Sequence, residues 1–593
     1  MFTYKKIRQI LIPTELRQLP GLLVLMLGGM AFEMLGIGLI IPVLALMTQT
    51  NLYENHSLLR PLLNLFGQPT QIQLVMGGML VLFGLYVLKT VFLIVMLSKQ
   101  NKYIYNLQAA ISHRLFRGYL QQPWTFHLQR NSSQLILNVT HEVNVFTNTW
   151  LQALMITLTE GLVLLGVITL LLVVEPVGTL IVVSVLGLAA WVFLYNLKGY
   201  ILSLGEARQY HEGMRIQHLQ QGLGGAKDVK IMGREFDFLT QYSAHCEQSV
   251  EVSRKQKTLS ELPRLWLELL AVGGLATLVF VLLMQGTALN VLIPTLGLFA
   301  AAAFRITPSA NRILNALQNL RYGLPVINML AQEFQLLNNI ALPQCKVVLP
   351  FIHEIKLSHL TYRYQNADHH ALNDIALTIR RGTSVGFIGT SGAGKSTLVD
   401  VILGLLTPNG GQVMIDGIDI QSNLRGWQDQ IGYVPQSIFL TDDTLRRNVA
   451  FGLSEDLIDE AAVFRAIKSA QLEEFVASLP QGVDTLVGER GVRLSGGQRQ
   501  RIGIARALYH DPEILVLDEA TSALDMATEK SVMEAINALH GDKTLLIIAH
   551  RLSTVAHCDW VYRMEKGYVV EEGRFESLNF SDKVTEAATL LAD

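Results

Sequence analysis

Six long apolar stretches fill most of the first 312 residues of the chain. A helix needs about 20 apolar residues to cross the roughly 30 Å hydrocarbon core of a bilayer. The stretches are Leu22–Met47, Ile72–Leu97, Trp150–Val174, Val177–Leu197, Leu265–Met284 and Leu289–Thr307. No stretch after residue 340 qualifies. The sequence therefore predicts a membrane α-helical bundle with six transmembrane helices, followed by a soluble part.

Charge separates the same two halves. The 593 residues are 50% hydrophobic and only 16% charged, whereas ordinary soluble domains carry about 25% charged residues. Residues 1–340 carry 24 Lys and Arg against 16 Asp and Glu, and the remaining residues carry 23 against 33. These numbers exclude a wholly soluble enzyme. They favour a transmembrane domain at 1–330, a linker at 331–350 and a soluble domain at 351–593.

Basic residues predict the orientation of the helices. Lys and Arg precede the first helix and crowd two long loops, near 98–149 and 198–264, whereas the short loops carry only Arg60. Because Lys and Arg accumulate on the cytoplasmic side, both termini and both long loops are expected in the cytoplasm. The periodic patterns of the long loops predict helices that continue out of the membrane. Ser57–Phe66 is either a short helix at the outer interface or an ordinary connector.

The soluble half contains a phosphate-binding loop. Gly389-Thr390-Ser391-Gly392-Ala393-Gly394-Lys395-Ser396 follows the strand-like run Ser384–Ile388 and opens a helix at Thr397. In such a loop the glycines let backbone N–H groups close around phosphates, Lys395 supplies positive charge and Ser396 supplies an oxygen for Mg²⁺. The strand, loop and helix context favours a P-loop site in an α/β domain. Three cysteines, far apart and without a CxxC pair, predict neither a disulfide scaffold nor a zinc site.

A second motif adds two carboxylates. The hydrophobic strand Ile514–Leu517 ends in Asp518 and Glu519. In a P-loop ATPase an Asp at this place holds the metal, and a neighbouring carboxylate polarises the attacking water. We therefore expect ATP and Mg²⁺ as cofactors and ATP hydrolysis as the reaction.

A third motif, Leu494-Ser495-Gly496-Gly497-Gln498, stands between the other two. With it the chain resembles the ATP-binding cassette (ABC) transporters over essentially its whole length. Further matching pieces, in the order of that family, are Gln436 in Val434–Ser437, Ser522–Asp525, and His550 in Ala549–Arg551. Tyr364, 25 residues before Gly389, matches the aromatic residue on which the family stacks adenine.

The resemblance implies a role for each matching residue. Tyr364 would stack on adenine, and Gly389, Ser391, Gly392, Gly394, Lys395, Ser396 and Thr397 would hold the phosphates of ATP. Ser495, Gly496, Gly497 and Gln498 would close the ATP site of a second chain. Glu519 would be the general base, and His550 would contact the γ-phosphate. Ser396, Gln436 and Asp518 would contact the metal.

The family also implies an assembly. One cassette in each chain implies a dimer, and the intact motifs favour a homodimer with two competent sites. A membrane half fused ahead of the cassette resembles an exporter half-transporter, of the type IV fold, in a bacterial inner membrane. Short cytoplasmic coupling helices are expected near Gln122–Asn131 and Gly222–Arg234.

Three motifs resemble a narrower group, the bacterial flippase of lipid-linked oligosaccharides used in protein N-glycosylation. They are Gly224–Lys230, Leu262–Arg264 and Arg305–Ile313. By this resemblance Lys89, Arg264, Arg305 and Arg312 would bind the pyrophosphate of an amphipathic lipid-linked saccharide, Lys89 replacing an arginine of that flippase. The alternative is that these four long side chains extend to the cytoplasmic interface. For Glu33 and Glu160, packing within the bundle is favoured over pairing with these cations or proton coupling.

Other functions fit the same scaffold. An exporter of lipid A, a drug or a peptide keeps the ATPase and changes the cargo, whereas an ATP-gated channel or regulator would not need the intact Glu519. A soluble DNA-repair ATPase with a similar signature is excluded by the apolar stretches. Membrane lipid, and not nucleic acid, is therefore the expected surrounding partner.

Overall fold

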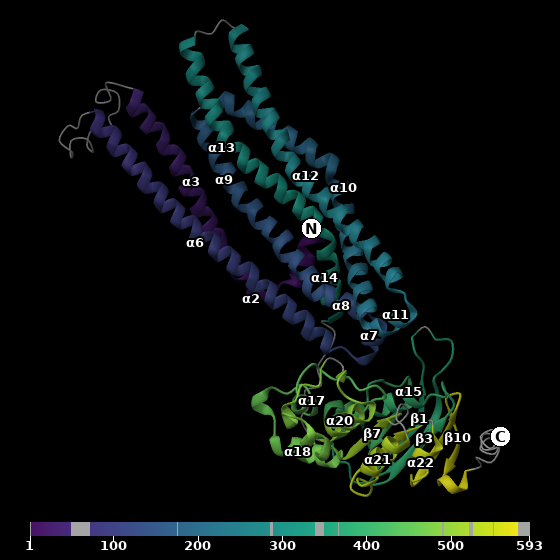
Figure 1. Ribbon diagram of the computed structural model, residues 1–593. Helices are drawn as coiled ribbons and strands as arrows, with labels where there is room; N and C mark the ends of the chain where they lie inside the picture. The colour runs from purple at the N-terminus through teal and green to yellow at the C-terminus, as the bar shows by residue number, and fades with distance from the viewer. Residues whose placement is uncertain are drawn as a thin grey trace. The chain divides into compact units, whose positions relative to one another are not determined.

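A computed structural model describes residues 2–48, 71–174, 176–284, 289–337, 349–365, 367–488, 491–520, 526–549 and 551–578 (Figure 1). The chain divides into two compact units. One comprises Met1–Gln122 and Gln129–Ile340, and the other comprises Pro123–Leu128 and Ala341–Asp593. The predicted outer segment Ser57–Phe66 lies outside the described residues. The first predicted coupling segment, Gln122–Asn131, contains the short piece that belongs to the second unit.

The first unit is helical. Its elements are α1 (Phe2–Ile10), α2 (Pro13–Leu16), α3 (Leu19–Thr48), α6 (Gln71–Leu120), α8 (Ser132–Leu137), the π-helical η1 (Asn138–Glu142) and η2 (Val145–Leu151), α9 (Gln152–Val174), α10 (Pro176–Gly224), α11 (Ala226–Met232), α12 (Glu235–Met284), α13 (Leu289–Tyr322) and α14 (Leu324–Leu337). Five of the six predicted apolar stretches fall on a single helix, and Trp150–Val174 begins in η2 and continues through α9. Because lipid offers the backbone no hydrogen-bond partner, a helix is the only local structure that satisfies such stretches. The prediction that α6, α10 and α12 continue beyond their apolar parts is confirmed.

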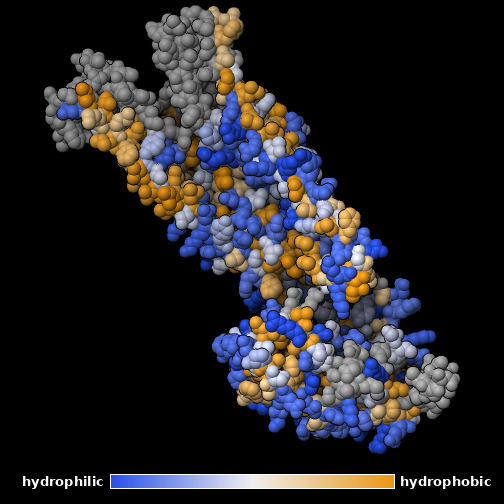
Figure 2. Space-filling model, in the orientation of Figure 1, coloured by the Kyte–Doolittle hydropathy of each residue, from blue (hydrophilic) through white to orange (hydrophobic). Residues whose placement is uncertain are grey.

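Four of the six predicted membrane spans are supported by the length and composition of the described helices. Within the described residues, four helical segments are long and apolar enough to cross a bilayer: Pro13–Gly36, Val75–Leu120, Ser132–Leu170 and Val183–Gly224. The remaining two predicted spans lie on α12 and α13, where many side chains are outside the description. Six spans therefore stay a prediction. Figure 2 shows hydrophobic side chains on the surface of this unit, and those of α6 include Ile72, Leu80, Val81 and Phe83, each more than 60% exposed.

The long helices pack in pairs. α3 packs on α6, α9 on α13, and α10 on α12. Close approach depends on small residues, as where α10 meets α13. A Cβ at Gly205 would lie 2.3 Å from the carbonyl oxygen of Tyr322, so this crossing accepts only glycine.

A buried ion pair joins the π-helical segment to α10. The guanidinium of Arg208 donates to both carboxylate oxygens of Glu142, at 3.1 and 3.0 Å. The two side chains are only 6% and 0% exposed. Both members are needed, because a buried charge without its partner is costly.

The second unit is an α/β domain with two sheets. Its strands are β1 (Glu354–Tyr362), β2 (Leu372–Arg380), β3 (Ser384–Gly389), β4 (Gly410–Ile415), β5 (Ile418–Asp419), β6 (Ile431–Val434), β7 (Ile514–Asp518), β8 (Thr544–Ile548), β9 (Trp560–Glu565) and β10 (Tyr568–Gly573). A four-stranded antiparallel sheet has the order β2-β1-β4-β5, and a six-stranded sheet has the order β10-β9-β3-β8-β7-β6. In the second sheet β9, β3, β8, β7 and β6 are parallel. The predicted α/β fold of the soluble half is confirmed.

Helices complete the second unit. They are α7 (Trp124–Gln129), α15 (Lys395–Ile402), α16 (Leu424–Gln428), α17 (Leu445–Val449), α18 (Glu460–Ser469), α19 (Glu473–Ser478), α20 (Gly496–Leu508), α21 (Met526–Asn537) and α22 (Leu552–Val555). Short 3₁₀ turns lie at Ile420–Ser422, Glu455–Leu457, Gly482–Asp484 and Phe575–Ser577. The central strands β3, β7 and β8 have apolar interiors, as expected for a sheet covered on both faces. The P-loop follows β3, Gln436 follows β6 and Asp518 ends β7, whereas the Leu494–Gln498 motif opens α20.

The buried pair generates a prediction about stability. Replacing Arg208 by Met should leave the Glu142 carboxylate buried without its partner, at a cost of about 3–5 kcal/mol. The midpoint of thermal unfolding of the purified protein, followed by intrinsic fluorescence, should fall clearly. The matched control is Arg254→Met, which removes an exposed pair with Glu251 (70% and 35% exposed) and should cost less than about 1 kcal/mol. Equal shifts in the two variants would contradict the role of the buried pair.

Candidate functional site

The loop between β3 and α15 has a backbone that glycine makes possible. Gly392 and Gly394 have φ angles of +80° and +100°, a region that other residues seldom adopt. A Cβ at Gly394 would also lie 2.6 Å from the carbonyl oxygen of Ala371. The loop therefore curls tightly and turns its backbone N–H groups toward one space, as phosphate binding requires.

Lys395 closes this loop. Its ammonium donates to the carbonyl oxygens of Gly389 at 2.8 Å and Thr390 at 3.1 Å. Burial lowers the pKa of Lys395, while Glu519 and Asp518 act in the opposite direction. The side chain is only 4% exposed, so its charge is held in place where an anion would sit.

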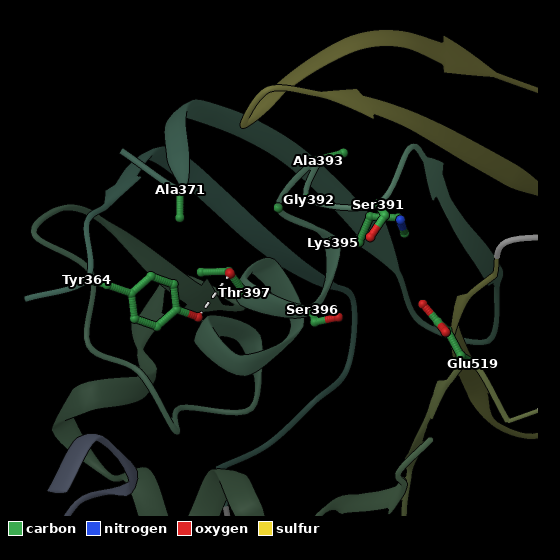
Figure 3. A pocket seen from close by; sticks show the side chains of 10 residues that line it. Tyr364, Ala371, Ser391, Gly392, Ala393, Lys395, Ser396, Thr397 and Glu519 are labelled. Atoms are coloured by element: carbon green, nitrogen blue, oxygen red, sulfur yellow. Dashed lines mark hydrogen bonds between the residues drawn. The ribbon is translucent and has the colours of Figure 1, made fainter. Parts of the chain in front are cut away.

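A cavity of about 320 Å³ opens over the loop. Figure 3 shows Tyr364 at one end, Glu519 at the other and the loop residues between them. Its lining is Tyr364, Ala371, Ser391, Gly392, Ala393, Gly394, Lys395, Ser396, Thr397 and Glu519. The hydroxyl of Tyr364 lies 3.1 Å from that of Thr397. An aromatic ring, a phosphate loop and a carboxylate in this order suit a nucleoside triphosphate.

Glu519 is held at the carboxyl end of β7. Its backbone N–H donates to Ile548 at the end of β8 (3.0 Å), and its φ angle is +49°. The Gln436 amide, from the loop after β6, donates to the Glu519 carboxylate at 2.7 Å. The structure thus brings together Gln436 and Glu519, two of the three predicted catalytic residues. The third, His550, lies outside the described residues.

Asp518 lies beside two groups that the sequence analysis did not single out. The hydroxyl of Tyr433, on β6, lies 3.4 Å from its carboxylate. Burial, followed by the negative charge of Asp518, raises the pKa of Asp400 to about 6. The sequence did contain a signal for Asp400, because it is the one acidic residue in the otherwise apolar turn Leu398–Ile402 of α15.

Oxygen donors are present for a hard cation. The predicted metal contacts Ser396, Asp518 and Gln436 offer a hydroxyl, a carboxylate and an amide, and Mg²⁺ prefers such oxygens together with phosphate and water. Among the described residues no group of three or more His, Cys, Asp or Glu side chains converges as a metal site. The donor set therefore suits a metal that arrives with a phosphate ligand, and the residues fit Mg²⁺.

The Ser495–Gln498 motif forms the beginning of α20. The Ser495 side chain accepts from the Gln498 N–H at 3.2 Å, and the Gln498 side chain accepts from the Ser495 N–H at 2.8 Å. This reciprocal capping fixes the first turn and leaves the N–H groups of Gly496 and Gly497 at the helix start, where anions bind favourably. None of the four residues is among those that line the cavity.

The four predicted substrate cations lie on three helices, α6, α12 and α13. Lys89, on α6, pairs with Glu33 of α3 at 2.8 Å, and the two side chains are 10% and 12% exposed. Arg312, on α13, pairs with Glu160 of α9 at 2.6 Å. Glu33 and Glu160 were expected to pack within the bundle rather than to pair with these cations. That expectation is wrong, because each glutamate forms an ion pair with one of the cations. Arg264 pairs with Glu268 on the same helix and is 62% exposed, whereas the side chain of Arg305 is outside the description.

Both parts of the chain match families of known proteins. Residues 29–305 match the family described as ABC transporter transmembrane region, and residues 372–522 match the family ABC transporter. A lipid A-core flippase of Ralstonia nicotianae is 30% identical over 81% of this chain and 80% of the relative. A lipid A-core flippase of Syntrophus aciditrophicus is 31% identical over 79% of this chain and 78% of the relative.

Two further matches extend the comparison. A putative multidrug export ATP-binding/permease protein of Staphylococcus aureus is 44% identical, but over only 38% of this chain and 39% of the relative. A solved bacterial Atm1-family ABC exporter with ATP bound has a TM-score of 0.78 and covers 97% of this chain and 98% of its own. It is 23% identical to this chain, so it shows the fold alone.

The cavity generates a prediction about nucleotide binding. If adenine stacks on Tyr364, Tyr364→Ala should raise the Kd for ATP by about 5- to 150-fold, because stacking of a base on an aromatic ring contributes about 1–3 kcal/mol. Tyr364→Phe keeps the ring and loses only the contact with Thr397, so its Kd should change by about twofold or less. Titration with a fluorescent ATP analogue measures both. A similar loss in the two variants would show that the hydroxyl, and not the ring, binds the nucleotide.

Proposed function

Because the chain belongs to the ABC transporter family as a half-transporter of the exporter type, we propose that it drives a phosphorylated glycolipid across a bacterial inner membrane. Proteins of this family hydrolyse ATP to power transport, and this chain is an ATP hydrolase of that kind. The finer assignments are the reacting residues, the dimer and the cargo. Each is supported by a different part of the molecule.

Glu519 is the proposed general base. It stands at the cavity end opposite Tyr364, where the terminal phosphate of a bound ATP would lie. Its hydrogen bond to Gln436 orients the carboxylate that would accept a proton from the attacking water. Lys395 and the loop N–H groups would neutralise the phosphates, with Ser396, Asp518 and Gln436 holding Mg²⁺, which supplies further positive charge.

Removing the base should separate hydrolysis from binding. Glu519→Gln keeps the shape of the side chain but cannot accept the proton, so the rate of phosphate release should fall by about 10²–10⁴-fold. The affinity for ATP should stay within about threefold of the original.

The matched control for this variant is Glu513→Gln. Glu513 precedes the same strand, is 40% exposed and pairs with Arg381, so its loss should leave hydrolysis nearly unchanged. Turnover that survives in Glu519→Gln would refute the assignment of the base.

A homodimer is the proposed assembly. The capped start of α20 presents N–H groups suited to phosphate, yet Ser495, Gly496, Gly497 and Gln498 do not line the cavity of their own chain. A second copy that turns this motif toward the cavity would complete the site. The cytoplasmic placement of both termini and of the cassette rests on the distribution of Lys and Arg.

Two ion pairs carry the proposal for the cargo. Charged side chains within apolar helices are costly and usually serve a function. Lys89 with Glu33 and Arg312 with Glu160 each join two helices of the bundle. An anionic headgroup could exchange for the carboxylates as the partner of these cations, Arg bidentately and Lys as a point charge. A polyprenyl-pyrophosphate oligosaccharide is the predicted cargo, and the names of two relatives favour a lipid A-core glycolipid as the second candidate.

The cargo can be tested through stimulation of ATPase activity in nanodiscs. The protein is titrated with a polyprenyl-pyrophosphate oligosaccharide, lipid A-core and a cationic drug in parallel. One of the two phosphorylated glycolipids should stimulate hydrolysis and the drug should not. The glycolipid that stimulates hydrolysis is identified as the cargo. Stimulation by the drug alone would overturn the cargo and leave the ATPase standing.

Variants separate binding from folding in the same assay. Lys89→Gln/Glu33→Gln removes the cation without leaving an unpaired carboxylate, and Arg312→Gln/Glu160→Gln does the same on α13 and α9. Each should lower stimulation by the glycolipid about tenfold while basal hydrolysis persists, since charged hydrogen bonds contribute about 1.5–3 kcal/mol. Lys257→Gln, from an exposed pair with Glu261, is the control and should respond like the unaltered protein.

A further inference from the structure

Three histidines meet where α10 and α12 run side by side. His211 and His218 lie seven residues apart on α10 and therefore on one face of that helix. His245, on α12, contacts both. Its Nδ1 lies 3.0 Å from Nδ1 of His211, and its ring stacks on that of His218 with centroids 5.4 Å apart and planes 19° apart. Tyr210 adds edge contacts to His211 and His245.

The hydrogen bonding of the cluster depends on its protonation state. Two Nδ1 atoms at 3.0 Å form a hydrogen bond only if one is protonated and the other is not. Nδ1 of His218 is buried and has no hydrogen-bond partner among the described residues. A neutral pair of His211 and His245 satisfies the contact between them, because one ring donates and the other accepts. With His211 and His245 both doubly protonated, two N–H groups and two positive charges would face each other.

Glu212, the next residue after His211, and Glu142 of η1 are already paired. On α10, Glu212 binds Arg215 and accepts from Ser249 of α12. Glu142 of η1 binds Arg208. His141 of η1 lies among these same charged groups, because Arg208, Glu142, Glu212 and Arg215 all act on it.

On α12 itself, two further carboxylates follow the cluster. Glu251 binds Arg254 and Lys255, and Glu247 is exposed. The pKa of His245 is lowered by burial and then by His211 and His218. A proton on the cluster therefore meets positive charge rather than a compensating acid.

The arrangement does not suit a metal ion. Two of the rings stack instead of pointing their nitrogens at one centre, and no metal-binding group of three or more His, Cys, Asp or Glu residues occurs in the described part of the chain. Titration is the remaining chemistry of such a group, because histidine changes charge near physiological pH.

The histidine cluster lies close to the turn that joins α10 to α12, so a change in its protonation would affect that turn. His218 precedes the start of α11 at Ala226 by eight residues, and His245 follows the start of α12 at Glu235 by ten. At a rise of 1.5 Å for each residue, the cluster lies about 12–15 Å along the helices from the turn that contains α11. That turn is the second predicted coupling segment, Gly222–Arg234. A change in the separation of α10 and α12 at the cluster would move this segment.

We propose that His211, His218 and His245 form a pH-sensitive latch between α10 and α12, which closes when neutral and loosens when protonated. Loosening displaces α11 and lowers the coupling of substrate to ATP hydrolysis. The last step rests on the proposed transport function, whereas the loosening itself does not.

The sign of the effect follows from linkage. Because the pKa of His245 in the packed state lies below the ordinary value of about 6.5, the separated state binds more protons, and the packed state loses stability as the pH falls below that value. Above it His245 is neutral and the latch is closed. Acidification should therefore open the pair, and alkaline pH should have no further effect.

Hydrogen exchange of the full-length protein in nanodiscs tests the latch directly. Peptides covering 205–222 and 238–252 are compared at about pH 6 and about pH 7.5, with labelling times scaled for the intrinsic pH dependence of amide exchange. Acid should raise exchange in both segments by between a fewfold and about tenfold. EDTA in all buffers removes any contribution of metals.

Two variants distinguish the latch from general acid sensitivity. His245→Gln cannot be protonated and should show equal exchange at both pH values, whereas His245→Lys is charged throughout and should show the acidic pattern at both. His113→Gln, which replaces an exposed histidine of α6, should keep the response of the unaltered protein. A pH response that survives in His245→Gln, or exchange that does not change in the unaltered protein, would overturn the latch.

Substrate-stimulated ATPase activity separates the two levels of the proposal. In the unaltered protein, stimulation should fall about twofold or more between about pH 7.5 and about pH 6, and in His245→Gln it should not. A pH-dependent exchange without a pH-dependent stimulation would keep the latch and refute its link to transport. Absence of stimulation by any glycolipid at either pH would refute the proposed cargo and leave the exchange result unaffected.

Discussion

The parallel pairing of β3, β8, β7 and β6 is the constraint on which the nucleotide site depends. Parallel strands end at one edge of the sheet, so the segments that follow them gather there. Gly389 ends β3, Asp518 ends β7, and the loop after β6 carries Gln436. Because the N–H of Glu519 also binds Ile548 of β8, the base is tied to the neighbouring strand. Residues far apart in the chain thus reach one edge of the sheet because backbone hydrogen bonds align the strands that carry them.

The same logic explains what the sequence made predictable. Apolar length is a local property, and it located every long helix of the first unit. The glycine-rich loop was equally local, because the positive φ angles at Gly392 and Gly394 admit few other residues. Both features depend on neighbours in sequence, and the structure agrees with both. The capping of α20 by Ser495 and Gln498 is equally local, but it was not predicted.

Pairings between distant helices were not predictable in this way. Lys89 was expected to bind substrate and Glu33 to pack within the bundle, yet they face each other across α6 and α3. The raised pKa of Asp400 comes from burial beside Asp518, and neither cause is visible in a linear sequence. His211 and His245 are 34 residues apart and meet only because α10 and α12 are adjacent. Helix partners, and hence the environment of a charge, are set by tertiary packing.

The capped start of α20 has a consequence for genetics. Ser495–Gln498 do not line the cavity of their own chain. In the proposed homodimer, each cavity would therefore be completed by the Ser495–Gln498 motif of the other chain. A defect in Lys395 and a defect in Ser495 would then fall in different halves of one composite site. Each allele alone would give an inactive homodimer. In the mixed dimer one site would carry both defects and the other site would be intact, so the two defects would complement each other although they lie in the same gene.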